Sequence, residues 1–339
     1  SVAKRAGGSI MKARKKNKLL LLICFVLLII FFIALSNGAA SVGKTAFWQA
    51  LVDFDGSKQS HQIIRNIRLP RVAGAFLVGS CFALSGALMQ GVTRNPLADS
   101  GLLGINAGAS LAMALSFAFW PKASGFSVFL VSLAGSFAVT LLVFGFLQFS
   151  KMGMNPLQLI LAGVAISSFF TAISQALTQF FNLQQDLAFW FVGGAANITW
   201  KQLTVLFPVY VLAVLVSFSL GKAISLISLS ETHALALGGR PKRTRLIVFC
   251  LVAVLAAIAV SLVGPVSFIG LLVPPIVRGM VGTDYRYVLP VSFLVGGGLV
   301  MLADLVARMI NPPFETPFGL VIALIGVPFL LIQVRRERR

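Results

Sequence analysis

One segment of the sequence has the spacing of a phosphate-binding loop. Residues 38–45 read GAASVGKT and match the pattern G-x-x-x-x-G-K-T, in which loop N–H groups and a lysine bind the phosphates of a nucleotide. Such a loop works when a buried strand precedes it and a helix N-terminus receives the phosphates. Here an apolar run of membrane-spanning length precedes it, and no soluble α/β pattern surrounds it. We therefore interpret residues 38–45 as an external turn.

Groups that could bind a metal or form a disulfide are also sparse. Cys24, Cys81 and Cys250 each lie within an apolar run, and the two histidines, His61 and His233, are far apart. This distribution supports neither a disulfide framework nor a Cys/His metal site. We expect the cysteines to pack among apolar side chains, as free cysteines usually do.

The acidic residues offer no catalytic pair. Of the nine acids, only Asp304 lies well inside an apolar run. Arg308 follows one turn later on the same helix face, so an internal ion pair is expected. Because the sequence contains no acid/base pair or activated nucleophile, we expect that the chain is not an enzyme and binds no cofactor itself.

The composition places the chain in a membrane. Of its 339 residues 58% are hydrophobic and 11% are charged, and the mean hydropathy is +0.95. This leaves too little polar surface to cover a water-soluble protein of this length. A helix needs about 20 apolar residues to cross the bilayer core, and about ten runs approach that length. They are 19–35, 70–92, 101–120, 126–147, 157–180, 203–221, 244–262, 268–282, 287–307 and 317–334.

The net charge of +19 follows a topological pattern. When the predicted spans alternate across the bilayer, most of the 28 basic residues fall on one side, as the positive-inside rule predicts for cytoplasmic segments. Both termini are then cytoplasmic, with residues 1–18 and 335–339 as basic tails, and no nucleic-acid partner is expected. Residues 1–10 precede Met11 and are expected to be an added remnant before the natural start.

A short polar island at residues 230–239 separates two apolar runs on the predicted cytoplasmic side. Ser230 is placed as the N-cap of a short amphipathic helix, and Gly238 and Gly239 end it before Pro241. Two interpretations are open. The helix either lies on the lipid surface or docks a cytoplasmic partner.

Several motifs together resemble the FecCD-type family, the iron-siderophore and vitamin B12 importer permeases that are the membrane subunits of type II ABC importers. The matching segments occur in the expected order and cover nearly the whole chain after the first span. They are RLPR at 68–71, SGALMQGVTRNPLAD at 85–99, LLGINAGA at 102–109, ETHALALGG at 231–239, GPVSFIGLLVPPIVRGMVGTDYRYVLP at 264–290, LADLVAR at 302–308 and ETPFGLVIALIGVPFL at 315–330. One departure is Pro275, where the family usually has a histidine.

This resemblance implies an all-α polytopic membrane protein with about ten transmembrane helices, the type II ABC importer permease fold, in one domain at residues 19–334. It implies a second permease subunit, either a copy or a paralogue, surrounded by lipid of a bacterial cell membrane. Two ATPase subunits would use ATP and Mg²⁺ on the cytoplasmic side, and a substrate-binding protein would deliver cargo from outside. The expected cargo is a ferric siderophore, preferably of hydroxamate type, with haem and cobalamin as alternatives.

The resemblance also implies two docking surfaces. The island becomes the coupling helix that contacts the ATPase, and its candidate residues are Glu231, Thr232, His233, Ala234, Leu235, Leu237, Gly238 and Gly239. Arg68, Arg71 and Arg308 match positions that receive acidic residues of the binding protein. Snorkelling to lipid headgroups is the alternative for these arginines.

Polar residues in and after the second span are candidates for the translocation path. They either face a water-filled lumen or hydrogen-bond between helices, because an unpaired polar group is costly in lipid. These candidates are Gln90, Thr93, Asn95 and Asn106. The break at 150–156 resembles the cytoplasmic turn that closes the path in the family, with a plain tight turn as the alternative. The gate candidates there are Gly153, Met154 and Asn155.

The rival class is a secondary transporter coupled to an ion gradient, which could also have this number of spans. Such a transporter usually needs ionisable groups near the middle of the membrane. Asp304, with its expected arginine partner, is the only acid in such a position. Dependence of uptake on ATP or on an ion gradient separates the two classes.

Overall fold

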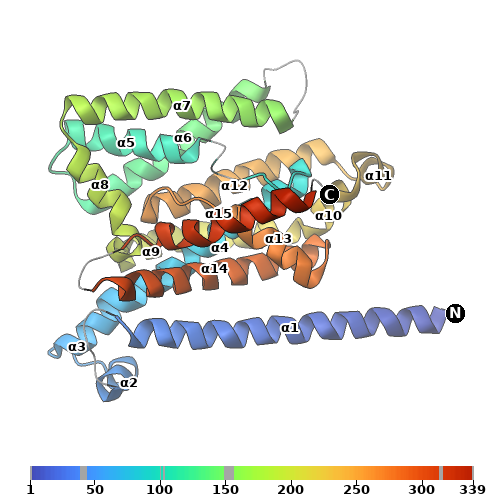
Figure 1. The fold of residues 1–339 in the computed structure, drawn as a ribbon, viewed down its shortest axis with the longest axis horizontal. Coiled ribbons are helices and arrows are strands. Elements are labelled where there is room, and N and C mark those ends of the chain that lie inside the picture. Colours follow the sequence, from blue (N-terminus) through green and yellow to red (C-terminus); the bar gives the residue numbers. More distant parts are fainter. Residues whose placement is uncertain are drawn as a thin grey trace.

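The computed structural model describes residues 2–38, 44–99, 101, 104–148, 156–312 and 316–337. Every regular element in this part of the chain is a helix, as Figure 1 shows, so the all-α prediction is confirmed. The longer helices are α1 (Val2–Ser36), α4 (Leu69–Thr93), α5 (Ile105–Phe119), α6 (Gly125–Gln148), α7 (Pro156–Phe180), α9 (Trp200–Ser219), α12 (Pro241–Val263), α13 (Ile269–Val281), α14 (Tyr285–Ile310) and α15 (Phe318–Glu337). The short ones are α2 (Lys44–Val52), α3 (Gln59–Gln62), the π-helix η1 (Ile63–Arg68), α8 (Gln184–Gly193), the 3-10 helix η3 (Gly194–Asn197), α10 (Gly221–Leu229) and α11 (Glu231–Ala236).

The apolar helices coincide with the predicted runs. Within the described residues, six helices are long and apolar enough to cross a membrane, and four shorter apolar helices correspond to the other predicted runs. The six are Lys18–Ser36, Gln59–Thr93, Leu161–Phe180, Trp200–Ser219, Pro241–Val263 and Tyr285–Ile310. The four are Ile105–Phe119, Gly125–Val139, Ile269–Val281 and Phe318–Gln333.

Two helical segments extend beyond their predicted runs. α1 begins at Val2, so most of the basic segment before residue 19 is helical. The elements α3, η1 and α4 follow one another without a break from Gln59 to Thr93, whereas hydropathy predicts a start at residue 70. A hydropathy run ends at the first charged residues, but Lys and Arg are good helix formers and do not end a helix.

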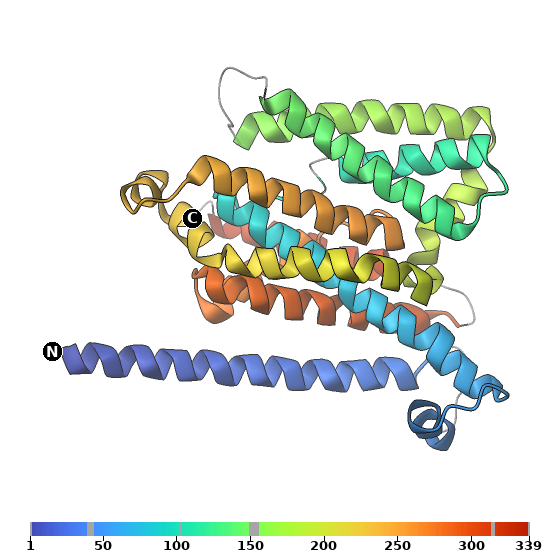
Figure 2. The same cartoon turned by 180° about the vertical axis from the view of Figure 1, so that it is seen from behind.

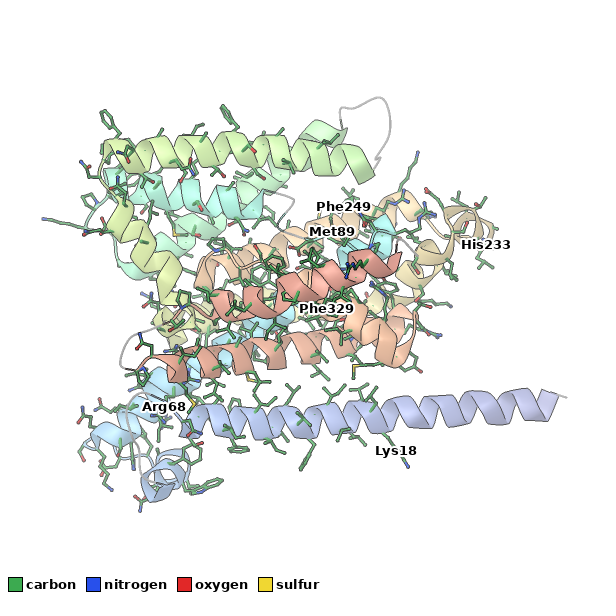
Figure 3. All side chains as sticks on the ribbon, in the orientation of Figure 1. Lys18, Arg68, Met89, His233, Phe249 and Phe329 are labelled. Carbon is green, nitrogen blue, oxygen red and sulfur yellow. The ribbon has the colours of Figure 1, made fainter. Side chains whose placement is uncertain are left out.

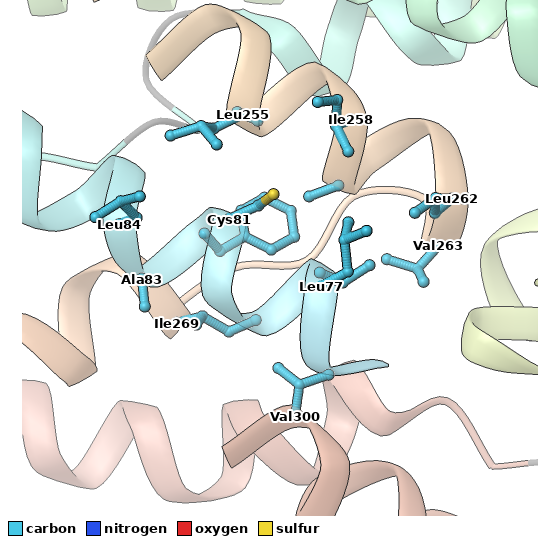
Figure 4. Packing of buried hydrophobic residues seen from close by; sticks show 14 of the residues in the cluster. Leu77, Cys81, Ala83, Leu84, Leu255, Ile258, Leu262, Val263, Ile269 and Val300 are labelled. Carbon is cyan, nitrogen blue, oxygen red and sulfur yellow. The ribbon is translucent and has the colours of Figure 1, made fainter. Parts of the chain in front are cut away.

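α4 lies at the centre of the fold. It packs against α14, α12 and α13, and nearly all of its side chains are buried. Glycines let the helices approach closely, because a Cβ at Gly79 would overlap the backbone of Gly296 and one at Gly86 would overlap that of Gly270. Figure 4 shows Cys81 of α4 among apolar side chains of α4 and α12. The packing role expected for this cysteine is confirmed.

Two groups of helices flank this centre. Helices α5, α6, α7 and α8 lie together on one side, and α1 runs along α14 on the other (Figures 1 and 2). The start of α1, the end of α15 and the short helix α11 lie toward one end of the bundle, and α2 and α3 lie toward the opposite end. The fold thus brings the polar island to the same end of the bundle as the start of α1 and the end of α15.

Candidate docking and translocation sites

The N-terminal half of α11 is braced against α12. Ser230 is the N-cap residue, as predicted, but its hydroxyl makes no capping bond to the helix and lies 3.1 Å from the Thr232 hydroxyl. The adjacent Glu231 carboxylate instead accepts from Arg245 of α12, at 2.9 Å to Nη2 and 3.3 Å to Nη1. This two-point ion pair fixes the position of the island relative to a membrane-spanning helix.

The double glycine ends α11 as the sequence predicts. Gly238 N–H donates to the Leu235 carbonyl at 2.9 Å, and Gly239 N–H donates to the Ala234 carbonyl at 2.8 Å. Gly238 has φ +74°, a left-handed conformation that costs glycine little. These two bonds form a Schellman motif, which closes the helix after little more than one turn.

The exposed side of α11 differs from the predicted one at a single residue. Ala234 is 1% exposed and packs inside the subunit, whereas Leu235 and Leu237 are 57% and 68% exposed. Thr232 and His233 are also exposed, and Figure 3 places His233 on α11, at the outer edge of the bundle. Large apolar side chains that face water are typical of an interaction surface. The surface available to a partner is therefore formed by these exposed residues and not by Ala234.

The helix before α11, α10, is itself held against the start of α14. The Ser225 hydroxyl of α10 donates to Asp284 Oδ1 at 3.1 Å and accepts from the Tyr285 N–H at 2.8 Å. Asp284 is also the N-cap of α14 and accepts from the Arg286 N–H. Hydrogen bonds from the Arg286 side chain, then from the Arg286 backbone N–H and the Ser225 hydroxyl, hold the pKa of Asp284 below its ordinary value. The carboxylate therefore stays charged at neutral pH and links α10 to the start of α14.

At the opposite end of the bundle, two arginines share one aspartate. Arg71 of α4 donates from Nη2 to Asp304 Oδ1 at 2.9 Å, and Arg308 Nε lies 3.1 Å from Asp304 Oδ2. The predicted ion pair between Asp304 and Arg308 is confirmed. Arg71 was not expected as a partner, because it is 233 residues away in sequence.

The same region holds the end of α1. Arg68 Nη1 donates to the Leu35 and Ser36 carbonyls at 2.9 Å each, and Arg308 Nη2 donates to the Ala34 carbonyl at 3.3 Å. These carbonyls belong to the last turn of α1, where helix carbonyls lack intrahelical partners and the helix dipole favours cations. Arg68, Arg71, Arg308 and Asp304, hereafter the arginine cluster, therefore join α1, η1, α4 and α14. Figure 3 labels Arg68, near the end of α1.

The three arginines of the arginine cluster are buried, which argues against the snorkelling role and leaves the docking role as a prediction. Arg68, Arg71 and Arg308 are 4–6% exposed, and each has partners within the subunit. Snorkelling to lipid headgroups requires guanidinium groups that reach the headgroup layer, and buried ones do not. The docking role stays a prediction, and a partner carboxylate would have to compete with the oxygens that these arginines already contact.

The polar residues of the second span are occupied inside the subunit. Gln90 Nε2 donates to the Gly270 carbonyl at 2.9 Å, and its Oε1 accepts from Arg278 at 2.8 Å. Gln90 thus follows the alternative of interhelical hydrogen bonding. The Thr93 hydroxyl donates to a carbonyl of its own helix at 2.6 Å, and Asn95 Oδ1 accepts a backbone N–H in the following turn.

The structure gives less information on the other candidates for the translocation path. Asn106 is partly exposed near the start of α5. The gate candidates Gly153, Met154 and Asn155 lie outside the described residues. Their assignments stay predictions.

A polar stripe on α7 was missed by the sequence reasoning. Ser168, Thr171, Gln175 and Gln179 are all exposed, and their spacing places them on one face of the helix. A cavity of about 390 Å³ lies against this face, between α7 and Gly101. Exposed polar groups on a membrane-spanning helix are costly in lipid, so this face requires water or a polar partner. The helical spacing of the four residues was the signal that could have revealed it.

The phosphate-loop pattern lacks the setting that such a loop needs. The segment lies partly outside the described residues, which omit 39–43. α1 ends at Ser36 and α2 begins at Lys44, so a helix and not a strand precedes it. A phosphate-binding loop requires a strand, a glycine-rich loop and a helix in succession. The geometry therefore gives no support for a nucleotide site.

Comparisons with known proteins agree on one family. The FecCD transport family model matches residues 26–336. The chain is 40% identical over 307 residues to the iron(3+)-hydroxamate import system permease protein FhuB of Bacillus subtilis (strain 168), which covers 91% of this chain and 80% of that protein. It is 40% identical over 279 residues to the Fe(3+) dicitrate transport system permease protein FecC of Escherichia coli (strain K12), with coverages of 81% and 83%.

A solved structure supports the same assignment. It is described as an inward-facing conformation of a metal-chelate type ABC transporter, and it has 30% sequence identity to this chain and a TM-score of 0.82 over 94% of this chain and 99% of that one. Members of this family are the membrane subunits of ABC importers and typically leave ATP hydrolysis to a partner. The chain belongs to the FecCD transport family and is a membrane permease subunit of an ABC importer.

Proposed function

We propose that this permease carries a ferric siderophore of hydroxamate type from an external binding protein into the cytoplasm. A second permease subunit completes the path, and two partner ATPase subunits drive transport by hydrolysing ATP with Mg²⁺. The single observation that supports this cargo is the 40% identity to the iron(3+)-hydroxamate permease over 91% of the chain. Because the second relative is named for ferric dicitrate, the cargo is the first point to test.

The cargo test compares labelled compounds in cells that contain the complete transporter. Radioactive iron is supplied as a hydroxamate siderophore, as citrate and as haem, and labelled cobalamin is supplied in parallel. We expect accumulation of the hydroxamate complex that is lost when the permease is deleted and returns when it is restored. Permease-dependent uptake of haem or cobalamin in place of the hydroxamate complex would contradict the cargo proposal.

In this proposal the end of the bundle that carries α11 faces the cytoplasm. Basic residues gather there at the start of α12, at Arg240, Lys242 and Arg243, as the positive-inside rule favours. The opposite end, with the arginine cluster, then faces the binding protein. Arginine is well suited to hold a carboxylate at two points, and this supports docking of acidic residues near Arg68.

Exchanging the charges of Glu231 and Arg245 tests whether α11 couples ATP hydrolysis in the partner to transport. We expect Glu231→Arg or Arg245→Glu alone to reduce the amount of cargo moved per ATP, because like charges then meet at the contact between α11 and α12. The Glu231–Arg245 pair is partly buried, and an ion pair near the surface contributes up to about 1 kcal/mol, so the expected loss is a few-fold. Uptake and hydrolysis are measured in the same proteoliposomes. The double variant, with Glu231→Arg and Arg245→Glu together, should recover part of the loss. A double variant that transports no better than either single variant would contradict a role of this ion pair in coupling.

We propose that the polar stripe of α7 lines the translocation path at the contact with the second permease. Thr171→Val combined with Gln175→Leu is expected to lower uptake by about tenfold, since two groups that hydrogen-bond polar cargo contribute about 0.5–1.5 kcal/mol each. The matched control is Phe169→Leu, an exposed apolar position of the same helix. Uptake is compared at equal amounts of assembled transporter. Equal loss in the control, or no loss in the double variant, would remove the stripe from the path.

The phosphate-loop pattern gives a prediction of no effect. Lys44→Ala is expected to leave ATP-driven uptake unchanged, because the lysine begins a helix that follows another helix. The purified permease without its ATPase should hydrolyse no ATP. A large loss of uptake in this variant would overturn both the interpretation of the turn and the proposed orientation.

The rival ion-coupled mechanism has less support from the geometry. Asp304 is the one acid within the described spans, and both of its carboxylate oxygens are occupied. Arg71 Nε lies 3.0 Å from Oδ1 and 3.1 Å from Oδ2, and Arg308 Nε lies 3.1 Å from Oδ2. A carboxylate that binds and releases a coupling cation needs at least one accessible oxygen. Asp304 is 1% exposed, so its arrangement suits a structural ion pair.

A further inference from the structure

A deep apolar groove separates α1 from α9, with α4 and α14 as its floor. It has a volume of about 910 Å³. The α1 side is formed by residues such as Leu28 and Phe31, the α9 side by Phe207 and Leu215, and the floor by residues such as Phe76. α1 packs against α14 and α4, and its exposed leucine and phenylalanine side chains face the surroundings of the bundle. Because these helices are membrane-spanning, the groove opens sideways into lipid.

The polar groups of the lining are already satisfied. Trp200 Nε1 donates to the Arg65 carbonyl at 2.8 Å, and the Thr204 hydroxyl donates to the Trp200 carbonyl at 3.0 Å. The Tyr210 hydroxyl lies 2.7 Å from the Ser80 hydroxyl, where the two form a buried hydrogen bond. Among the described lining residues, these groups therefore make no demand for a polar ligand. The chemistry of the groove selects an aliphatic occupant.

The dimensions of the groove suit a pair of hydrocarbon chains. From Trp200 to Leu215 the lining of α9 extends about 22 Å at 1.5 Å per residue. A hydrocarbon chain about 4–5 Å wide needs roughly 300–400 Å³ over that length. The groove, with its volume of about 910 Å³, therefore accommodates the two chains of one phospholipid.

The rim of the groove is suited to a headgroup. Trp200 lies at the first position of α9, at the end where tryptophan usually marks the membrane interface. The exposed Arg65 accepts the Trp200 indole hydrogen bond at its backbone carbonyl, and its guanidinium lies over the Phe54 ring, 4.4 Å from the ring centroid. Arginine at the interface attracts a lipid phosphate.

We propose that this groove is a binding site for one membrane phospholipid, whose acyl chains fill the space between α1 and the body of the permease. α1 is tied to the body at its end by carbonyl contacts with Arg68 and Arg308. The lipid supports the part of α1 that faces α9 across the groove. This site is independent of the cargo and of the ATPase partner.

Two tryptophan substitutions on one helix test the site. Leu215 lines the groove and is 61% exposed, whereas Leu212 is 64% exposed and does not line it. Transporter is purified with extensive detergent washing, and bound phospholipid per permease is measured by mass spectrometry. We expect the parent and Leu212→Trp to retain phospholipid, and Leu215→Trp to retain about tenfold less, because the larger side chain occupies part of the groove.

A second measurement keeps the test decisive if Leu215→Trp fails to assemble. A photoreactive benzoylphenylalanine replaces Phe207, which lines the groove, or Val209, which is exposed but does not line it. After the same washing, light should produce a lipid adduct at position 207 and little at 209. Equal lipid retention in both tryptophan variants, no retained lipid in the parent, or a protein adduct at position 207 would overturn the proposal.

Discussion

Asp304→Asn is expected to destabilise the permease by about 3–5 kcal/mol, the usual cost of leaving buried charges without their partner. Arg71 and Arg308 both contact the Asp304 carboxylate, and all three side chains are buried. Removal of the negative charge leaves two guanidinium groups in a region where water cannot replace it. The measurement is the temperature at which the detergent-purified transporter loses its monodisperse peak in size-exclusion chromatography.

A matched control separates this effect from ordinary charge removal. Lys58 and Asp55 form an exposed pair at 3.5 Å on the same end of the molecule, and exposed pairs contribute little. Lys58→Gln should therefore leave the transition unchanged. Equal stability of Asp304→Asn and the parent protein would show that the arginine cluster does not depend on its aspartate.

Leu237→Asp is expected to abolish most of the association with the ATPase. Leu237 is exposed on α11, and an unpaired charge in an apolar contact costs on the order of several kcal/mol, so co-purification of the ATPase should fall by at least about tenfold. The fold of the permease should remain intact, because the side chain makes no part of its core. The measurement is the ratio of ATPase to permease after affinity purification.

Two further variants define what a loss would mean. Leu237→Ala keeps the surface apolar and should retain most of the association. Ala234→Asp places a charge inside the subunit, where Ala234 is buried, and should lower the yield of the permease itself. Undiminished association and uptake in Leu237→Asp would remove the coupling role from α11.

The architecture could be predicted because its signals are local in sequence. Each apolar run predicts one helix from its own residues, and the ten predicted runs have counterparts among the described helices. The end of α11 was likewise predictable, since Gly238 and Gly239 carry the Schellman motif in their own residue types. Length, hydropathy and capping act over a few turns and need no knowledge of tertiary contacts.

The sites were less predictable because they depend on contacts between distant segments. Asp304 could be paired with Arg308 from helical spacing, but its contact with Arg71 exists only because α4 packs against α14. Ala234 and Leu235 have similar positions in the island sequence, and only the packing of α11 shows that one is buried and the other exposed. Gln90 illustrates the same limit, since its partners Gly270 and Arg278 come from α13.

Purified transporter in proteoliposomes tests the central claim most directly. The permease is reconstituted with its ATPase, and the binding protein is supplied on the outside with an iron-loaded hydroxamate siderophore. We predict that radioactive iron accumulates inside only when ATP and Mg²⁺ are enclosed, and that dissipating proton and sodium gradients leaves the rate unchanged. Accumulation that needs an ion gradient and proceeds without ATP would contradict the account.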